Sequence, residues 1–338
     1  MTPTFADVTA AAARIAPYAV RTPLVESWQL NAMTGGRIFL KLETLQRTGS
    51  FKFRGACNRL AMIPESARPA GVVAFSSGNH AQGVAAAAQL FGMPALIVMP
   101  SDAPRPKIEG TRVFGAEIVS YDRVRDDREA IAAKICAERG AVLVKPFDQA
   151  EIIAGQGTVG LEIAKAAVHL GVELDDVLVP CSGGGLVSGT ALGLKGCASD
   201  SVAHGAAAKV HSVEPENFDG MKRSLEAGKR VQAPGGKLSI ADALMAPIPG
   251  AVVFEVAKDL LAPGFAVTDA ELERAVVFAA EKLKLLVEPG GAAALAALLA
   301  GRLDAHGKTV ALVVSGGNAE LAQVAEMVSR HSASAGAS

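Results

Sequence analysis

Residues 176–194 read DVLVPCSGGGLVSGTALGL, in which an apolar run passes through a serine- and glycine-rich loop into a helical pattern. The same order recurs in residues 72–88, VVAFSSGNHAQGVAAAA, and in residues 308–324, KTVALVVSGGNAELAQV. In open parallel sheets, ligands bind at the carboxyl ends of the strands, where glycine lets the backbone come close and free N–H groups at a helix start attract an anion. One such loop can be a simple tight turn. Three of them predict convergence on one bound molecule.

Strand-like and helix-like segments alternate along the rest of the chain. The expected strands cover residues 37–42, 72–75, 95–98, 117–120, 142–144, 176–179, 209–213 and 309–314. The expected helices cover residues 82–91, 125–138, 158–170, 269–285 and 291–299. A capping box of Thr268 and Glu271 marks the start of the fourth helix. The strands are rich in Val, Ile and Leu without polar alternation, so the pattern predicts an α/β protein with mainly parallel sheets buried on both faces.

The composition indicates a globular protein with balanced charge. The chain has 338 residues, which suggests about two domains or one large one, and 50% of them are hydrophobic, with a mean hydropathy of +0.30. Lys and Arg number 33 against 34 Asp and Glu, so the net charge of -1 gives no reason to expect nucleic acid or a membrane surface as a partner. No run of about 18 uncharged apolar residues and no secretory-type N-terminus occurs, so we expect a cytoplasmic protein.

The cysteines give no sign of a metal or disulfide framework. They are Cys57, Cys136, Cys181 and Cys197. Because they form no CxxC pair and have no zinc-type spacing with the histidines, we expect reduced and mostly buried thiols.

Residues 155–160, GQGTVG, match the dinucleotide fingerprint G-x-G-x-x-G. That fingerprint requires a strand directly before its first glycine, and here none is expected there. We therefore interpret these glycines as a means of close helix–sheet packing, with a helix that begins at Thr158.

Lys52 lies in residues 50–58, SFKFRGACN, between two phenylalanines and two residues before Arg54. A lysine in such a stretch is often a solvated surface residue. Here the apolar flanks predict a dry environment, and desolvation together with a nearby cation lowers the pKa of a lysine and makes its amine nucleophilic. An aldehyde cofactor can use such an amine as a Schiff base, and residues 182–185 offer a glycine-rich cradle for a phosphate. The combination points to pyridoxal phosphate.

The chain resembles the fold-type II pyridoxal-phosphate enzymes of the threonine/serine dehydratase and serine racemase family. The resemblance runs from about Thr22 to about Glu320 and rests on motifs that agree in order and spacing. They are TPL at 22–24, KLE at 41–43, GSFKFRGA at 49–56, SSGNHAQG at 76–83, AGQGT at 154–158, SGGGL at 182–186, VEP at 213–215, EPGGA at 288–292 and SGGN at 315–318.

This resemblance implies a tryptophan synthase β-like fold with two open, mostly parallel sheets flanked by helices. It implies a large cofactor-binding domain of residues 1–70 and 149–338 and a small substrate-clamping domain of residues 71–148. It also implies a homodimer. About 20 residues follow the SGGN motif, so we expect no regulatory domain and no feedback by isoleucine.

The resemblance also implies how pyridoxal 5′-phosphate is bound. Lys52 is expected to hold it as a Schiff base beside Phe51, and Asn79 to hydrogen-bond its ring hydroxyl oxygen. Ser315 is expected to face the pyridine nitrogen, where a neutral hydroxyl favours β-elimination over a long-lived carbanion. The phosphate is expected at the backbone N–H groups of Gly183, Gly184, Gly185 and Leu186. Ser182 stands where many relatives carry a further glycine, so the backbone geometry at that position stays open.

The implied reaction is an α,β-elimination from an amino acid. The expected substrate-binding residues are Ser76, Ser77, Asn79 and His80. Lys52 would remove the α-proton as general base, the β-hydroxyl would leave, and threonine would give 2-oxobutanoate or serine pyruvate, each with ammonia. Ser77 leaves two interpretations open, a catalytic serine as in serine racemases or a hydroxyl that binds carboxylate or caps the next helix. Serine racemisation and dehydration of another β-hydroxy amino acid, such as 3-hydroxyaspartate, are therefore the rival activities.

Departures from the family pattern bear on two further points. Relatives bind a divalent cation through the glutamate of VEP and a carboxylate six positions later, but here Glu214 is followed by Gly220 at that place, with Asp219 one residue early. We therefore predict no metal. Cysteine-synthase-type replacement chemistry is disfavoured because His80 stands where those enzymes usually carry threonine, and the intact Lys52 argues against a catalytically silent protein.

Overall fold

The computed structural model describes residues 1–76, 78–103, 105–197 and 207–335, and their strands form two separate sheets. In chain order the strands are β1 (Leu24–Glu26), β2 (Arg37–Leu42), β3 (Val72–Phe75), β4 (Ala95–Pro100), β5 (Glu117–Tyr121), β6 (Val142–Val144), β7 (Asp176–Pro180), β8 (Lys209–Pro215), β9 (Phe265–Val267) and β10 (Thr309–Val314). The expected fold class of two open, mostly parallel sheets is confirmed.

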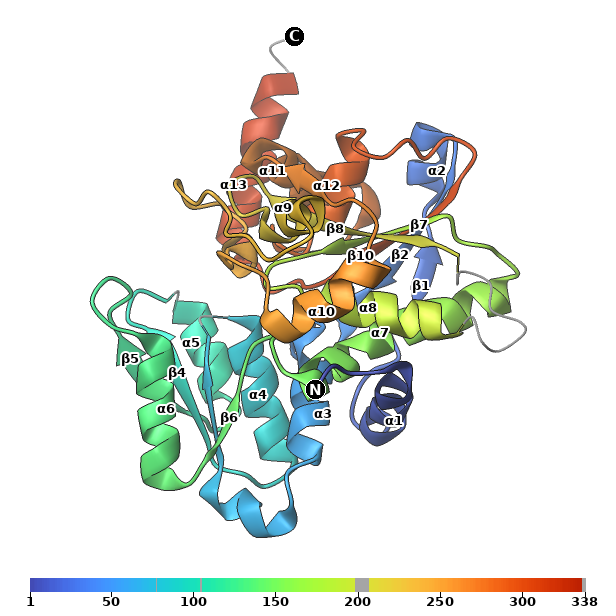
Figure 1. Ribbon diagram of the computed structural model, residues 1–338. Helices are drawn as coiled ribbons and strands as arrows, with labels where there is room; N and C mark the ends of the chain where they lie inside the picture. Colours follow the sequence, from blue (N-terminus) through green and yellow to red (C-terminus); the bar gives the residue numbers. More distant parts are fainter. Residues whose placement is uncertain (77, 104, 198–206, 336–338) are drawn as a thin grey trace.

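The larger sheet has six strands in the order β1-β2-β10-β7-β8-β9 and lies in the upper right of Figure 1. Every pair in it is parallel except β1 with β2, which is antiparallel. Strands β7 and β10 are central and almost wholly buried, as their unbroken apolar runs predict. The sequence analysis did not predict the three-residue edge strands β1 and β9.

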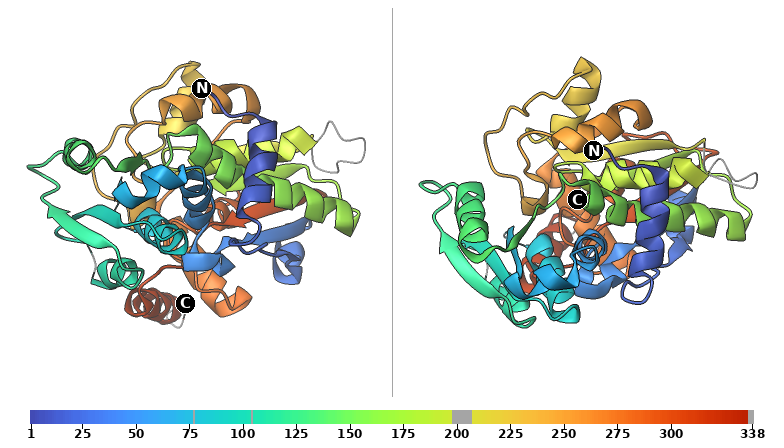
Figure 2. Two further views of the ribbon diagram at one scale, coloured as in Figure 1. Left: turned by 90° about the horizontal axis from the view of Figure 1, so that it is seen from below. Right: turned by 60° about the horizontal axis from the view of Figure 1, so that its bottom comes forward.

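The smaller sheet has four parallel strands in the order β5-β4-β3-β6, all within residues 72–144. Figure 2 shows from two further directions that these blue-green strands stay on one side of the molecule. The apolar cluster on this sheet also includes Phe53, Leu60 and Ile152, which come from outside that range. Helices from outside residues 72–144 therefore pack on the smaller sheet and join it to the rest of the chain.

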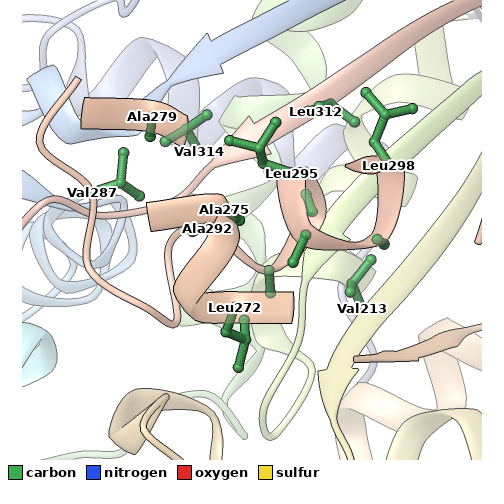
Figure 3. Close-up of a cluster of buried hydrophobic side chains, with 14 of the residues drawn as sticks. Val213, Leu272, Ala275, Ala279, Val287, Ala292, Leu295, Leu298, Leu312 and Val314 are labelled. Carbon is green, nitrogen blue, oxygen red and sulfur yellow. The ribbon is translucent and has the colours of Figure 1, made fainter. Parts of the chain in front are cut away.

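Helices surround both sheets. They are α1 (Phe5–Ile15), α2 (Trp28–Thr34), α3 (Lys52–Ala61), α4 (Asn79–Leu90), α5 (Arg105–Arg112), α6 (Arg128–Arg139), α7 (Ala150–Leu170), α8 (Gly185–Gly196), α9 (Gly220–Ala227), α10 (Ala251–Leu260), α11 (Asp269–Phe278), α12 (Ala293–Leu299) and α13 (Leu321–Ala335). The capping box of Thr268 and Glu271 is confirmed at the start of α11. Figure 3 shows how α11 and α12 pack leucine, valine and alanine side chains against β10 and β8 to form one core of the larger lobe.

The expectation for GQGTVG was wrong in two respects. These residues do not open a helix at Thr158 but lie inside α7, which begins eight residues earlier, and they pack on helices rather than on a sheet. A Cβ at Gly160 would lie 2.0 Å from a carbonyl oxygen of α8, and a Cβ at Gly155 would lie 2.6 Å from the Cα atom of Gly55 in α3. The glycines therefore let α7 approach α3 and α8 more closely than side chains allow.

Two other properties of the described residues bear on the sequence expectations. Among them, no helix has both the length and the apolar character that crossing a membrane requires. Cys57 and Cys181 are free, buried thiols, and Cys136 is a free thiol of intermediate exposure.

Candidate active site

A cavity of about 220 Å³ lies between the two sheets, at the carboxyl ends of their strands. Residues that follow β3, β7 and β10 line it, together with the start of α3 and the segment 242–246. The three loops singled out in the sequence are therefore neighbours around one space. Residues from both sheets form its walls.

Lys52 is the first residue of α3 and lines this cavity. Its Nζ atom donates a hydrogen bond to the Pro146 carbonyl oxygen at 2.8 Å and lies 5.2 Å from the centroid of the Phe51 ring. The N–H of Phe51 donates to the Ser315 carbonyl oxygen, so the backbone ties this helix start to the end of β10. Burial lowers the pKa of Lys52 to about 8, although the nearby charge of Glu288 acts in the opposite direction.

The glycines of residues 183–185 form the turn between β7 and α8. Gly184 has a φ of 95°, which a side chain rarely adopts, and a Cβ at Gly183 would lie 2.4 Å from the Phe147 ring. No side chain caps α8, and its first residues line the cavity, so backbone N–H groups and the positive end of the helix dipole are available to an anion there. This bare cradle fits the phosphate of pyridoxal phosphate, and the amine of Lys52, which lines the same cavity, fits its aldehyde.

Asn79 is the first residue of α4 and is buried beside Glu288. Its Nδ2 atom donates to Glu288 Oε1, and its Oδ1 atom accepts a hydrogen bond from Asn318 Nδ2 at 2.8 Å. Burial raises the pKa of Glu288 to about 7, while the hydrogen bond from Asn79 and the charge of Lys107 act to lower it. In the sequence, Glu288 is visible only as the first letter of EPGGA. Its contacts become apparent in the fold.

His80 lines the same cavity and is 2% exposed. Its Nε2 atom lies 3.1 Å from the Val144 carbonyl oxygen, and because a carbonyl only accepts, Nε2 carries the proton. Burial, reinforced by the charge of Lys52, lowers the pKa of His80 to about 3. His80 is therefore a neutral imidazole at neutral pH, and its ring cannot supply a positive charge for a substrate carboxylate.

The serines of the site have different surroundings. Ser76 lines the cavity, and its hydroxyl oxygen accepts the N–H of Gly78 at 3.2 Å, which shapes the loop before α4. Ser315 is 5% exposed and also lines the cavity. Ser77, which the resemblance relates to racemisation, lies outside the described residues.

The segment 242–246 forms a further wall that sequence reasoning missed. The hydroxyl oxygen of Ser182 accepts the N–H of Ala246 at 3.2 Å, so a serine before the glycines anchors this wall to the cradle. Asp242 forms an ion pair with Lys107 of α5, which spans the two sides of the cavity. The partners are 135 positions apart, and no local pattern in the sequence links them.

Two arginines near the end of β5 were also missed. Arg123 donates to Asp102 Oδ1 at 2.7 Å, and the guanidinium carbon of Arg128 lies 5.4 Å from the centroid of the Phe75 ring. Both line the cavity. Their stretch, RVRDDRE at residues 123–129, is densely charged, as the solvated start of a surface helix often is, so the sequence holds no signal that they face a site.

A buried ionic network lies under α3. Arg54 is 0% exposed and donates to Glu43 at 2.7 and 2.8 Å and to Glu162 at 2.7 and 2.9 Å. The Nζ atom of Lys41 lies 2.5 Å from Glu162 Oε2. The network joins Lys41 and Glu43 of the KLE motif to Arg54 of the GSFKFRGA motif. It therefore explains why these charged residues are buried in the structure.

Glu214 caps a helix. Its two carboxylate oxygens accept the N–H groups of Met221 and Lys222, each at 2.8 Å, at the start of α9. Burial raises the pKa of Glu214 to about 8, although these two hydrogen bonds oppose the shift. Asp219 is paired with Arg223 at 2.7 Å. Both acids that relate to the family's cation site thus have protein partners in this chain.

Comparison with known proteins identifies the family to which this chain belongs. The family model for pyridoxal-phosphate-dependent enzymes matches residues 15–316. The L-threo-3-hydroxyaspartate ammonia-lyase of a Pseudomonas species is 41% identical over 324 residues, which cover 95% of this chain and 97% of the relative. The L-threonine ammonia-lyase of Thermotoga maritima is 42% identical over 310 residues, which cover 92% of this chain and 74% of the relative.

Solved structures agree with the sequence comparison. Maize serine racemase superposes with a TM-score of 0.88 at 36% identity, and the match covers 98% of each chain. The chain therefore belongs to the pyridoxal-phosphate-dependent enzymes of fold type II, and its cofactor is pyridoxal 5′-phosphate.

Proposed function

We propose that this enzyme is an ammonia-lyase that converts L-threonine or L-serine by α,β-elimination into 2-oxobutanoate or pyruvate and ammonia. The observation that carries the proposal is a pair of groups whose segments are joined by the backbone hydrogen bond between Phe51 and Ser315. One is the Lys52 amine, whose pKa of about 8 suits a general base, and the other is the neutral hydroxyl of Ser315. The names of the two ammonia-lyase relatives support the same reaction class.

We propose a role for each of the residues around the cavity. The backbone N–H groups of residues 183–186 would hold the phosphate, Asn79 would donate to the ring oxygen, and Ser315 would face the ring nitrogen. Bound pyridoxal phosphate supplies an electron-withdrawing ring that stabilises negative charge at the substrate Cα atom. Ser76 and the start of α4 would orient the substrate carboxylate.

Proton movement at the substrate is assigned to Lys52. Its neutral amine takes the proton from the substrate Cα atom, the C–O bond at Cβ breaks, and the hydroxyl gains a proton and departs as water. Hydrolysis of the dehydrated amino acid then consumes one water and releases the keto acid and ammonia. Because burial lowers the pKa of Lys52, a useful share of this amine is uncharged near pH 7 to 8.

A specific observation favours a second substrate, L-threo-3-hydroxyaspartate. Arg123 and Arg128 line the cavity, and a guanidinium binds a second carboxylate through paired hydrogen bonds. The ammonia-lyase of the Pseudomonas species supports this alternative by its name. If it is correct, Arg128→Gln should reduce kcat/KM for 3-hydroxyaspartate by about 10-fold or more and change that for threonine little.

Serine racemase activity remains the other alternative, supported by the maize relative. It depends on Ser77 and is tested by chiral analysis of serine after incubation with the enzyme. Accumulation of D-serine that Ser77→Ala abolishes would favour it. Absence of D-serine under conditions where pyruvate forms would exclude it.

We also propose that residues 71–148 form a clamping domain, whose approach to the rest of the chain excludes water when substrate binds. The ion pair of Lys107 with Asp242 across the cavity supports such closure.

The homodimer is part of the same proposal. A solution mass of 34.5 kDa, the mass of one chain, would contradict it.

The test of the main proposal is direct. The purified holoenzyme is incubated with L-threonine, L-serine and L-threo-3-hydroxyaspartate, and keto acid and ammonia are measured separately. Equal amounts of both products are expected, and Lys52→Ala should abolish them while Lys134→Ala, a substitution on the surface of α6, should not. Unchanged activity in Lys52→Ala, or no keto acid from any of the three substrates, would refute the assignment.

A further inference from the structure

Asn318, in the SGGN segment after β10, has both hydrogens of its side-chain amide engaged. Its Nδ2 atom donates to the Thr48 carbonyl oxygen and to Asn79 Oδ1, each at 2.8 Å. An amide nitrogen carries two hydrogens and the amide oxygen carries none. Rotating this amide by half a turn would place its oxygen against two other oxygens, so its orientation is determined.

The loop that holds Asn318 is tightly built. Thr48 has a φ of 66°, which is uncommon for a residue with a side chain, and Gly49 follows with a φ of 69°. A Cβ at Gly49 would lie 2.4 Å from Asn318 Oδ1, and the Gly317 N–H donates to the Gly49 carbonyl oxygen at 2.9 Å. Backbone conformations of this kind persist where the surroundings over-determine them, and they gather at functional sites.

The orientation of the Asn79 side-chain amide is fixed by partners at both its oxygen and its nitrogen. Asn318 occupies its oxygen, and Glu288 accepts from its nitrogen. A Cβ at Gly316 would lie 2.3 Å from Glu288 Oε1 and 3.3 Å from Asn79 Nδ2, so this bare Cα leaves room for the pair. Since Asn79 lines the cavity, the free hydrogen of its nitrogen is the part of the amide left for a ligand.

We propose that Asn318 is a positioning residue, which fixes the Asn79 amide so that the cofactor meets a hydrogen-bond donor and not an acceptor. The inference rests on the proposal above that Asn79 contacts the ring oxygen of pyridoxal phosphate. A fixed donor favours that oxygen in its deprotonated form, because a charged acceptor makes the stronger hydrogen bond. The charged groups Lys52, Lys107 and Asp242 act on Glu288 in this network.

The test replaces the donor amide of Asn318 by a carboxylate of the same shape. In Asn318→Asp, Asn79 must turn its nitrogen toward the new acceptor and its oxygen toward the cavity. The dissociation constant of pyridoxal phosphate, titrated into apoenzyme by fluorescence, should rise about 10- to 100-fold. The pH at which the bound cofactor loses its ring-hydroxyl proton, read from its absorbance spectrum, should rise by about 1 to 2 units. Asn318→Ser, which has one donor for two acceptors, should give smaller changes of the same sign and also serves if Asn318→Asp does not fold.

Two controls separate the possible failures. Asn318→Asp with Glu288→Gln supplies a donor to the reversed Asn79 amide, so its apoenzyme should melt at a higher temperature than Asn318→Asp alone while the cofactor remains weakly bound, although the Thr48 carbonyl oxygen still lacks its donor. In Asn79→Ala the cofactor spectrum should shift as well. If Asn79→Ala leaves the spectrum unchanged, the proposed cofactor contact is wrong, and the inference falls with it. If Asn79→Ala shifts the spectrum but the Asn318 variants keep the wild-type dissociation constant and titration, the inference alone is overturned.

Discussion

Replacing Arg54 by methionine should destabilise the protein strongly, because it leaves buried carboxylates without their partner. Arg54 and Glu43 are both fully buried, and Arg54 contributes four hydrogen bonds to Glu43 and Glu162. Two bases and two acids balance in this network, since Lys41 pairs with Glu162. Arg54→Met leaves one excess negative charge in a place where water cannot solvate it.

The expected magnitude follows from the geometry. Removing one partner of a buried ion pair costs about 3–5 kcal/mol of unfolding free energy. At about 2 °C per kcal/mol for a chain of this size, the melting temperature of the apoenzyme should fall by roughly 6–10 °C. Because Lys52 is two residues away on the same helix, cofactor affinity should fall as well.

Thermal unfolding followed by circular dichroism measures this effect, with two comparisons. Arg37→Met removes an ion pair with Glu26 of similar length, 2.8 Å, but with side chains 51% and 34% exposed. It should cost less than about 1 kcal/mol. Arg54→Met combined with Glu43→Gln removes the excess charge and should recover part of the loss. If Arg54→Met melts no lower than Arg37→Met, or the double variant melts lower still, the reasoning about buried charge is wrong.

Further predictions concern the site. The rate at which apoenzyme takes up cofactor requires the neutral Lys52 amine, so it should rise with pH around a midpoint near 8, in stopped-flow absorbance. Glu288→Gln should move that midpoint lower, since the charge of Glu288 raises the pKa of Lys52, and an upward shift would contradict this. Lys107→Met should raise KM by about 5-fold at most without changing cofactor affinity, because the pair with Asp242 is partly exposed. The reversed pair Lys107→Asp with Asp242→Lys should restore KM in steady-state kinetics, and failure to do so argues against an ionic clasp. Gly184→Ala should weaken cofactor binding in a titration, since its φ is 95° and its Cβ would lie 2.5 Å from Met221 and Val253. Gly228→Ala has a φ of 65° but open space, and an equal effect there would show that backbone strain alone matters.

Much of the fold is predictable because its signals are local. Strands β2, β3, β6 and β10 begin and end where the apolar runs do. Exceptions have physical causes. Helix α7 begins before Thr158 and runs through the glycines, because they let it pack closely on α3 and α8. No single segment of the sequence contains that packing.

The candidate site divides in the same way. Residues 183–185 and Lys52 could be selected from the sequence because a bare turn before a helix and a lysine between aromatic residues are local features. Arg128 and Asp242 could not, because nothing in the residues next to them in the sequence marks a site. Their presence in the cavity wall depends on how the two sheets are placed.

The sequence by itself determined the strand–loop–helix units, the bare glycine cradle and the lysine between two phenylalanines, since each depends on residues close together in the chain. Only the tertiary structure decided which polar groups become partners. Asn318 meets Asn79 across 239 positions, Asn79 meets Glu288 across 209, and Lys107 meets Asp242 across 135. The physical reason is that the direction of a hydrogen bond and the cost of a charge depend on what surrounds the group, and packing alone supplies those surroundings.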